Sequence, residues 1–205
     1  LRIGEVCGLT WQDENLEKQY LTVRRSMRYN NARHKTEIGA TKRRKVRTVD
    51  FCDTLAEILR TAKLEQHKNR FKYGELYRLN YYCEVKEKDR NYYEVYTLSR
   101  NEKIPEGYKE ISFVCLRPDG AYEAPSTIGV MCKRASKKVE GLEGFHFHQL
   151  RHTFTSNLLS NGAAPKDVQE LLGHSDVSTT MNVYAHSTRE AKRTSARLLD
   201  KVVGG

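Results

Sequence analysis

The spacing of apolar residues changes along the chain, and this change limits the fold more than any other feature. Strand-like alternation occurs in short segments up to about Cys115, whereas helical spacing prevails from about Pro125 to the end. One helix, with Asp53 as its N-cap and running through about His67, is expected between the strands. The pattern therefore predicts an α+β domain that is mainly helical, with two small hairpins near its front.

Basic residues are concentrated in the first of these hairpins. It enters at Tyr20–Val23, breaks at Asn30-Asn31 and Gly39, and leaves at Val46–Val49. From Arg24 to Arg47 there are ten basic residues and one acid, within a net charge of +10 for the whole chain. Such a hairpin favours a nucleic-acid partner over a membrane, because the stretch has no amphipathic basic helix with aromatic anchors. Alternatively, its charges only keep an edge strand from aggregating. The candidate DNA-binding residues are Arg24, Arg25, Arg28, Arg43, Arg44, Lys45 and Arg47.

A tyrosine-rich segment at about 77–108 predicts the second hairpin. Two β-rich arms, Tyr81–Val85 and Tyr92–Tyr96, flank a turn of charged residues. The tyrosines either form a docking surface for another protomer or pair across the strands, and both interpretations stay open. A short strand is expected next, at Ile111–Cys115, before the turn at Pro118-Asp119-Gly120.

Helices are expected in the remainder of the chain. One stops at Asn161-Gly162, and its buried face is predicted to contain Leu150, Phe154, Leu158 and Leu159. The next begins at Pro165 and ends at Gly173, because proline is tolerated in a first turn and glycine suits a helix end. Two more are expected at about 177–184 and 188–202.

Composition excludes several classes of protein. No window approaches about 18 uncharged apolar residues, and the N-terminal residues have no signal-peptide layout. The five cysteines are an odd number without CxxC spacing, which indicates free thiols in a reducing cytosol rather than a disulfide framework or a zinc ribbon. We therefore expect a chain of the cytosol that does not enter a membrane.

Several short motifs follow one another in a defined order. His148 and Arg151 stand at i and i+3, so they share one face of a helix, and Leu171-Leu172-Gly173-His174 places another histidine just past a helix end. Tyr184 lies in the segment Thr179-Thr180-Met181-Asn182-Val183-Tyr184-Ala185-His186. Together with Leu1-Arg2-Ile3-Gly4-Glu5-Val6 at the front and Lys42 in the basic hairpin, this set resembles the tyrosine recombinase family, the site-specific integrases of phages and conjugative transposons.

The resemblance implies a fold, a reaction and a set of catalytic residues. The fold is the family's catalytic domain, with a small antiparallel sheet and a β-hairpin insertion at about 77–108. The reaction is DNA strand cleavage and rejoining through a 3′-phosphotyrosyl intermediate, in the integration or excision of a mobile element such as a conjugative transposon. Lys45 is an alternative to the lysine of the set. The implied catalytic residues are Arg2, Lys42, His148, Arg151, His174 and Tyr184.

These residue types fit the chemistry of a phosphodiester. The anionic oxygens of a phosphodiester repel a nucleophile, and its alkoxide is a poor leaving group. An enzyme must therefore neutralise the charge on the oxygens and protonate the alkoxide. The forks of Arg2 and Arg151 suit the non-bridging oxygens. Tyr184 is the nucleophile, with His148 as its base and His174 as a hydrogen-bond donor to the phosphate, and Lys42 protonates the departing 5′ oxygen. The chain has no carboxylate cluster for Mg²⁺, so the arginines take the part of a metal.

The resemblance also bears on partners and domains. It implies double-stranded DNA as substrate, an accessory excision factor, and a tetramer on DNA linked by the C-terminal helix, which could instead pack on its own core. Residues 1–205 are expected to be an N-terminally truncated catalytic domain without arm-binding and core-binding domains. The alternatives are a type IB topoisomerase, which religates the original strand, and a DNA-binding module without catalysis.

Overall fold

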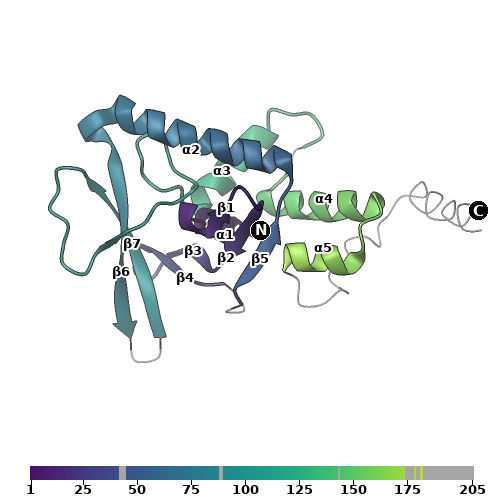
Figure 1. The fold of residues 1–205 in the computed structure, drawn as a ribbon, viewed down its shortest axis with the longest axis horizontal. Helices are drawn as coiled ribbons and strands as arrows, with labels where there is room; N and C mark the ends of the chain where they lie inside the picture. The colour runs from purple at the N-terminus through teal and green to yellow at the C-terminus, as the bar shows by residue number, and fades with distance from the viewer. Residues whose placement is uncertain (42–44, 88–89, 143, 174–177, 179–180, 182–205) are drawn as a thin grey trace, which may run out of the picture. The chain divides into compact units, whose positions relative to one another are not determined.

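The computed structural model describes all residues except 42–44, 88–89, 143, 174–177, 179–180 and 182–205 (Figure 1). The chain divides into two compact units, residues 1–147 and 148–205, and each is described by itself. The helices expected at about 177–184 and 188–202 fall almost entirely outside the described residues. No helix in the described part of the chain is long and apolar enough to cross a bilayer.

Two antiparallel sheets form the centre of the first unit (Figure 1). The smaller has the order β1-β2-β5, with β1 at Glu14–Asn15, β2 at Tyr20–Val23 and β5 at Arg47–Asp50. The larger has the order β3-β4-β7-β6-β8. Its strands are β3 (Arg25–Asn30), β4 (Lys35–Ala40), β6 (Arg78–Glu87), β7 (Arg90–Ser99) and β8 (Lys109–Glu110).

The basic segment contains more strands than the sequence predicts. The expected single hairpin is an outer pair, β2 with β5, that encloses an inner pair, β3 with β4. Gly39 was expected to break the pattern, but it lies inside β4 opposite Ser26. Its backbone φ is not in the left-handed region and the space around it is open, so nothing at this position requires a turn.

The tyrosine-rich hairpin forms in the predicted place and joins the larger sheet. Its two ten-residue strands pair along their whole length, with Tyr81 opposite Tyr96. Tyr82 and Tyr93 make an edge-to-face contact with ring centroids 5.5 Å apart, which favours the cross-strand interpretation of the tyrosines. Because β7 also pairs with β4, through Ile38 opposite Tyr93, the hairpin is continuous with the basic segment.

Three α-helices and two 3₁₀ turns complete the first unit. They are α1 (Ile3–Cys7), η1 (Trp11–Asp13), α2 (Asp53–Tyr73), η2 (Gly74–Leu76) and α3 (Pro125–Ser136). Asp53 was predicted to be an N-cap, but the N-cap is Cys52, and the Asp53 carboxylate instead accepts a hydrogen bond of 2.6 Å from Gln19. The helix also runs past His67 to Gly74, whose φ of 52° suits glycine and ends it.

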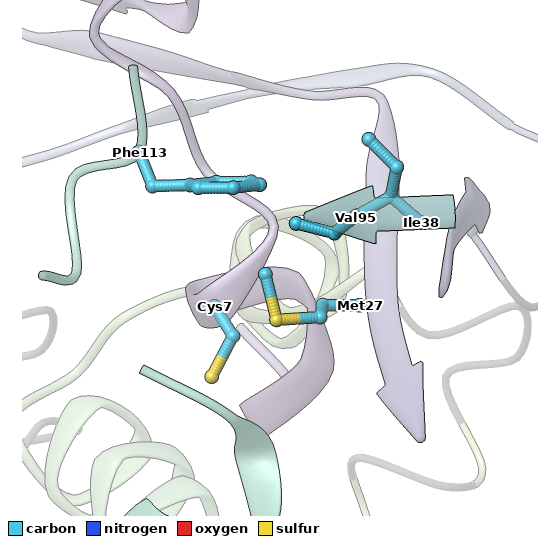
Figure 2. Close-up of a cluster of buried hydrophobic side chains, with 5 residues drawn as sticks. All are labelled: Cys7, Met27, Ile38, Val95 and Phe113. Atoms are coloured by element: carbon cyan, nitrogen blue, oxygen red, sulfur yellow. The ribbon is translucent and has the colours of Figure 1, made fainter. Parts of the chain in front are cut away.

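Two apolar clusters hold the first unit together. Figure 2 shows the larger, in which Phe113 packs with side chains from α1, β3, β4 and β7, namely Cys7, Met27, Ile38 and Val95. The smaller contains Leu9, Leu21 and Leu59. The strand expected at Ile111–Cys115 is wrong, because only an isolated bridge links Phe113 to Thr10. The apolar pattern of this segment reflects the burial of the Phe113 ring and not pairing in a ladder of strands.

The second unit has two described α-helices, α4 (Phe147–Ser160) and α5 (Pro165–Leu172). The helix α5 begins at Pro165 and ends at Gly173 as predicted, and Leu159, Val168 and Leu172 form its core with α4. The predicted buried face of α4 is partly wrong, because Leu150 and Phe154 are roughly half exposed. Leu159 is buried as predicted, and the other buried residues, Arg151 and Thr155, precede it at intervals of four.

Candidate active site

The motif at the front of the chain forms a compact arginine site. Arg2 is the N-cap of α1, and its backbone N–H donates to Oε2 of Glu5 at 2.9 Å. The Arg2 side chain turns to the same carboxylate, with Nη1 3.3 Å from Oε1. Arg2 therefore has both its backbone and its guanidinium tied to one acid, and its side chain remains partly exposed for an anionic ligand.

A second arginine holds the same carboxylate from another strand. Arg47, the first residue of β5, donates from Nη1 to Oε1 of Glu5 at 3.1 Å and from Nη2 to Oε2 at 2.7 Å. The Glu5 side chain is only 2% exposed. Burial alone would raise the pKa of Glu5, but the hydrogen bonds from Arg47 and from the backbone of Arg2, together with both positive charges, outweigh it and lower the pKa. Glu5 is consequently a buried carboxylate that stays ionised.

The glycine of the motif lets α1 lie close to the sheet. A Cβ atom built on Gly4 would stand 2.6 Å from the carbonyl oxygen of Met27 and 2.6 Å from Oγ of Ser26. A side chain at this position would push α1 away from β3. The sequence Arg2-Ile3-Gly4-Glu5 thus combines a helix cap, a close backbone approach and a buried anchor within one turn.

The candidate lysines lie on the loop between β4 and β5. Lys42, Arg43 and Arg44 are outside the described residues, so their predicted roles stay predictions. Lys45 is described and exposed. The hydroxyl of Thr41 donates to the carbonyl oxygen of Lys45 at 3.0 Å, which brings together the two ends of the segment that carries Lys42.

The second unit contains the helical pair predicted from the sequence. His148 is exposed on α4, and its ring makes an edge-to-face contact with His152 at 5.0 Å between centroids. Arg151, one turn further on, is 8% exposed and donates from Nη2 to the carbonyl oxygen of Leu172 at 2.6 Å. Leu172 is the last residue of α5, and Gly173, its left-handed C-cap, directly precedes His174 in the sequence. His174 and Tyr184 themselves lie outside the described residues.

Two more buried carboxylates hold arginines of the basic segment. Asp13 accepts from Arg24 at 2.8 Å and from Arg25 at 2.7 Å. Glu37 accepts from Arg28 at 3.0 Å and 2.8 Å. Arg24 and Arg28 remain 51% and 56% exposed, so each can still present donors to a phosphate.

Sequence reasoning did not assign a role to Glu5, Asp13 or Glu37. The signal for Glu5 was its i+3 spacing from Arg2 at a helix start, and the signal for Glu37 was its being the one acid in the basic segment. Asp13 offered no comparable signal. Within the described ranges, no group of three or more histidine, cysteine, aspartate or glutamate side chains is arranged to hold a metal ion.

Comparison with known proteins gives one family. The model of the phage integrase family matches residues 1–191. A XerC-like tyrosine recombinase of Caldanaerobacter subterraneus is 28% identical over 209 residues, which cover 98% of this chain and 46% of that protein. The tyrosine recombinase XerC of Chlorobaculum tepidum is 30% identical over 188 residues, covering 92% of this chain and 42% of that protein. The chain thus spans about half the length of the curated relatives that it matches.

Solved structures agree on the fold. The integrase of transposon Tn1549, solved in complex with transposon right-end DNA, superimposes with a TM-score of 0.65 at 23% identity, over 97% of this chain and 55% of that one. XerA recombinase superimposes with a TM-score of 0.59 at 21% identity, over 95% of this chain and 51% of that one. At these identities the likeness shows the fold alone.

Proposed function

The chain belongs to the phage integrase family, and we propose that it cleaves and rejoins DNA strands at specific sites through a 3′-phosphotyrosyl bond to Tyr184. The observation that carries this proposal is the arginine site at the front of the family match. There, Arg2 is held by a buried, ionised carboxylate while its guanidinium stays partly exposed. A cation fixed in this way is preorganised for the charge that grows on a phosphate in the transition state.

Each predicted residue has one task in the proposed reaction. The Tyr184 oxygen attacks the phosphorus and gives its proton to His148, while the bond to the 5′ oxygen breaks and Lys42 protonates that oxygen. Arg2 and Arg151 bind the non-bridging oxygens, and His174 adds a hydrogen bond. The products are a phosphotyrosyl protein and a free 5′-hydroxyl. Because the ester is exchanged and not hydrolysed, a second 5′-hydroxyl can reverse the step without ATP.

The substrate is double-stranded DNA. The exposed guanidinium groups of Arg24 and Arg28 support this, since both lie on or beside β3 in the strongly basic segment. Lys45, Arg43 and Arg44 are further phosphate contacts on the loop after β4. The natural role that we propose is integration or excision of a mobile element, because the fold is shared with a transposon integrase and the β6–β7 hairpin resembles the insertion of such enzymes.

Strand exchange between two duplexes needs more than one protomer. We assign the link between protomers to the C-terminal segment at about 188–202, which has apolar residues at helical spacing. The complete assembly is a tetramer on DNA, joined during excision by an accessory factor. The protein works in the bacterial cytoplasm at the nucleoid.

A nicked suicide substrate tests the reaction. Incubation of the protein with this DNA, followed by a denaturing gel, is expected to give a covalent protein–DNA band that disappears in Tyr184→Phe. Any upstream region of the natural protein is included in the assay, so that DNA binding is complete. Binding without a covalent band would leave only a DNA-binding module. A band followed solely by religation of the original strand would instead indicate a topoisomerase.

A further inference from the structure

We propose that Arg47 is a positioning residue of the active site, which acts on Arg2 through the carboxylate of Glu5. The proposal rests on the function proposed above and adds a residue to it. The sequence suggested a phosphate contact for Arg47, and the geometry points to this other task.

The pairing of Arg47 with Glu5 is bidentate. Two separate nitrogen atoms of Arg47 meet the two oxygen atoms of Glu5, at 3.1 Å and 2.7 Å, so the carboxylate is fixed in position and in rotation. The Nε–H of Arg47 is buried and has no hydrogen-bond partner among the residues that the structure describes. All the hydrogen bonds described for this guanidinium thus go to one acid.

Both oxygen atoms of Glu5 also serve Arg2. Oε2 accepts from the Arg2 backbone at 2.9 Å, and Oε1 faces Nη1 of the Arg2 side chain at 3.3 Å. A rotation of the carboxylate would therefore move or release Arg2. Arg47 is the group that prevents this rotation, and its charge helps to keep the buried carboxylate ionised.

Burial and the contact with Glu5 separate Arg47 from the exposed arginines of the basic segment. Its side chain is 13% exposed, against 51% for Arg24 and 56% for Arg28. To reach a phosphate, Arg47 would have to leave Glu5, and a buried charge would then be left without its partner. If Arg47 stays bound to Glu5, no buried charge loses its partner.

The backbone of Arg47 connects the site to the lysine loop. Arg47 pairs with Val23 at the start of β5, immediately after the loop that carries Lys42 and Lys45. The same residue therefore sets one end of that loop and the orientation of Arg2. In the proposed reaction Arg2 binds the phosphate and the lysine of the loop protonates the departing 5′ oxygen. Because Arg47 fixes both elements, it keeps their positions constant relative to each other.

The test is the variant Arg47→Lys, because a lysine keeps the charge but cannot hold both oxygen atoms in a fixed plane. We expect single-turnover cleavage at saturating DNA to fall about 10- to 100-fold, with the DNA dissociation constant changed by less than about twofold. Arg117→Lys is the matched control, since Arg117 also lies near a carboxylate, with Nε 3.8 Å from Glu123, but outside this site. It should cleave at the wild-type rate. Equal cleavage by Arg47→Lys and wild type would overturn the proposal.

Two further measurements separate positioning from a general loss of structure. With a weaker partner the pKa of Glu5 rises, so the effect of Glu5→Gln on the free energy of unfolding should begin to shrink at a higher pH in the Arg47→Lys background than in the Arg117→Lys background. The double variant Glu5→Gln/Arg47→Gln leaves no unpaired charge in the interior and should cleave at the rate of Glu5→Gln alone. Additive losses in this cycle, or the same pH dependence of the Glu5→Gln effect in both backgrounds, would refute an action through Glu5. If wild type forms no covalent product, the proposed function fails and this inference falls with it, whereas cleavage by wild type with any of the contrary results defeats this inference alone.

Discussion

The guanidinium of Arg151 donates a hydrogen bond of 2.6 Å to the carbonyl oxygen of Leu172, the last residue of α5. The contact satisfies a carbonyl that the helix itself leaves without a partner. Since Gly173 turns the chain into the left-handed region directly afterwards, Arg151 is bound to the backbone that leads to His174. One catalytic candidate thereby supports the segment from which another emerges.

Arg151→Ala is expected to abolish cleavage and retain most DNA affinity. One phosphate contact among several contributes little to the salt-dependent binding, and the slope of affinity against salt should fall by only about one charge. The lost hydrogen bond from the charged guanidinium to Leu172 should lower the free energy of unfolding by about 1.5–3 kcal/mol. Cleavage on a suicide substrate, salt-dependent binding and denaturant unfolding measure the three quantities. Parallel losses of binding and cleavage would contradict the assignment.

A sulfur substitution identifies the general acid. In a 5′-bridging phosphorothiolate the leaving group is a thiolate, which departs without a proton. Lys42→Ala should therefore cleave ordinary DNA poorly and the phosphorothiolate at close to the wild-type rate. Lys45→Ala is the matched comparison, and little sulfur rescue is expected for it. The reverse pattern, with rescue of Lys45→Ala only, would transfer the role to Lys45.

Gly4→Ala should destabilise the protein by about 1–3 kcal/mol, because the new methyl group would meet the Met27 backbone at 2.6 Å. Cleavage should fall as well, since α1 carries Arg2. Gly129→Ala in α3 is the control, because the space around Gly129 is open and alanine is the better helix former by about 0.5–1 kcal/mol. Urea unfolding of both variants checks the prediction. A neutral effect of Gly4→Ala would mean that α1 does not lie against β3 as described.

Acid should remove the stabilisation that Glu5 provides. Its pKa is lowered in the folded protein from an ordinary value of 4.5, so the contribution is complete above that value and is lost as the pH falls through the folded-state value. The difference in unfolding free energy between wild type and Glu5→Gln should consequently be constant from neutral pH down to about pH 5.5 and shrink below about pH 4.5. Denaturant titrations across this range measure it. The same difference at neutral and strongly acid pH would show that Glu5 is not held as an ion.

Local signals predicted the elements that local residues determine. Pro165 and Gly173 marked both ends of α5, and alternating tyrosines marked β6 and β7. The sequence did not predict that the basic segment contains two pairs of strands. Glycine usually indicates a break in a strand, whereas the backbone of Gly39 is extended within β4. The buried face of α4 was predicted wrongly in part because Arg151 and Thr155 are polar. Thr155 can nevertheless be buried, because its hydroxyl donates a hydrogen bond of 2.8 Å to the Arg151 carbonyl oxygen.

The catalytic candidates could be predicted by family resemblance, but their supporting residues could not. Glu5 and Arg47 are far apart in the sequence, and charged residues are ordinarily expected at the surface. Only the pairing of β5 with β2 and the close approach at Gly4 bring the two together. Such a contact depends on tertiary structure, and a charge pattern alone favours the simpler interpretation of a surface that meets DNA.

The pairing of β4 with β7 has a consequence for the order of folding. The hairpins β3–β4 and β6–β7 each join residues that are near in sequence, so each can form early. The ladder between β4 and β7 must close a long loop that includes the whole of α2, and it rests on only two residue pairs, Glu37 with Glu94 and Ile38 with Tyr93. We expect this ladder to form late and to set the folding rate of the first unit. Substitutions at Ile38 should slow folding, and so should substitutions that weaken the β6–β7 hairpin, because contacts formed at or before the transition state change mainly the folding rate.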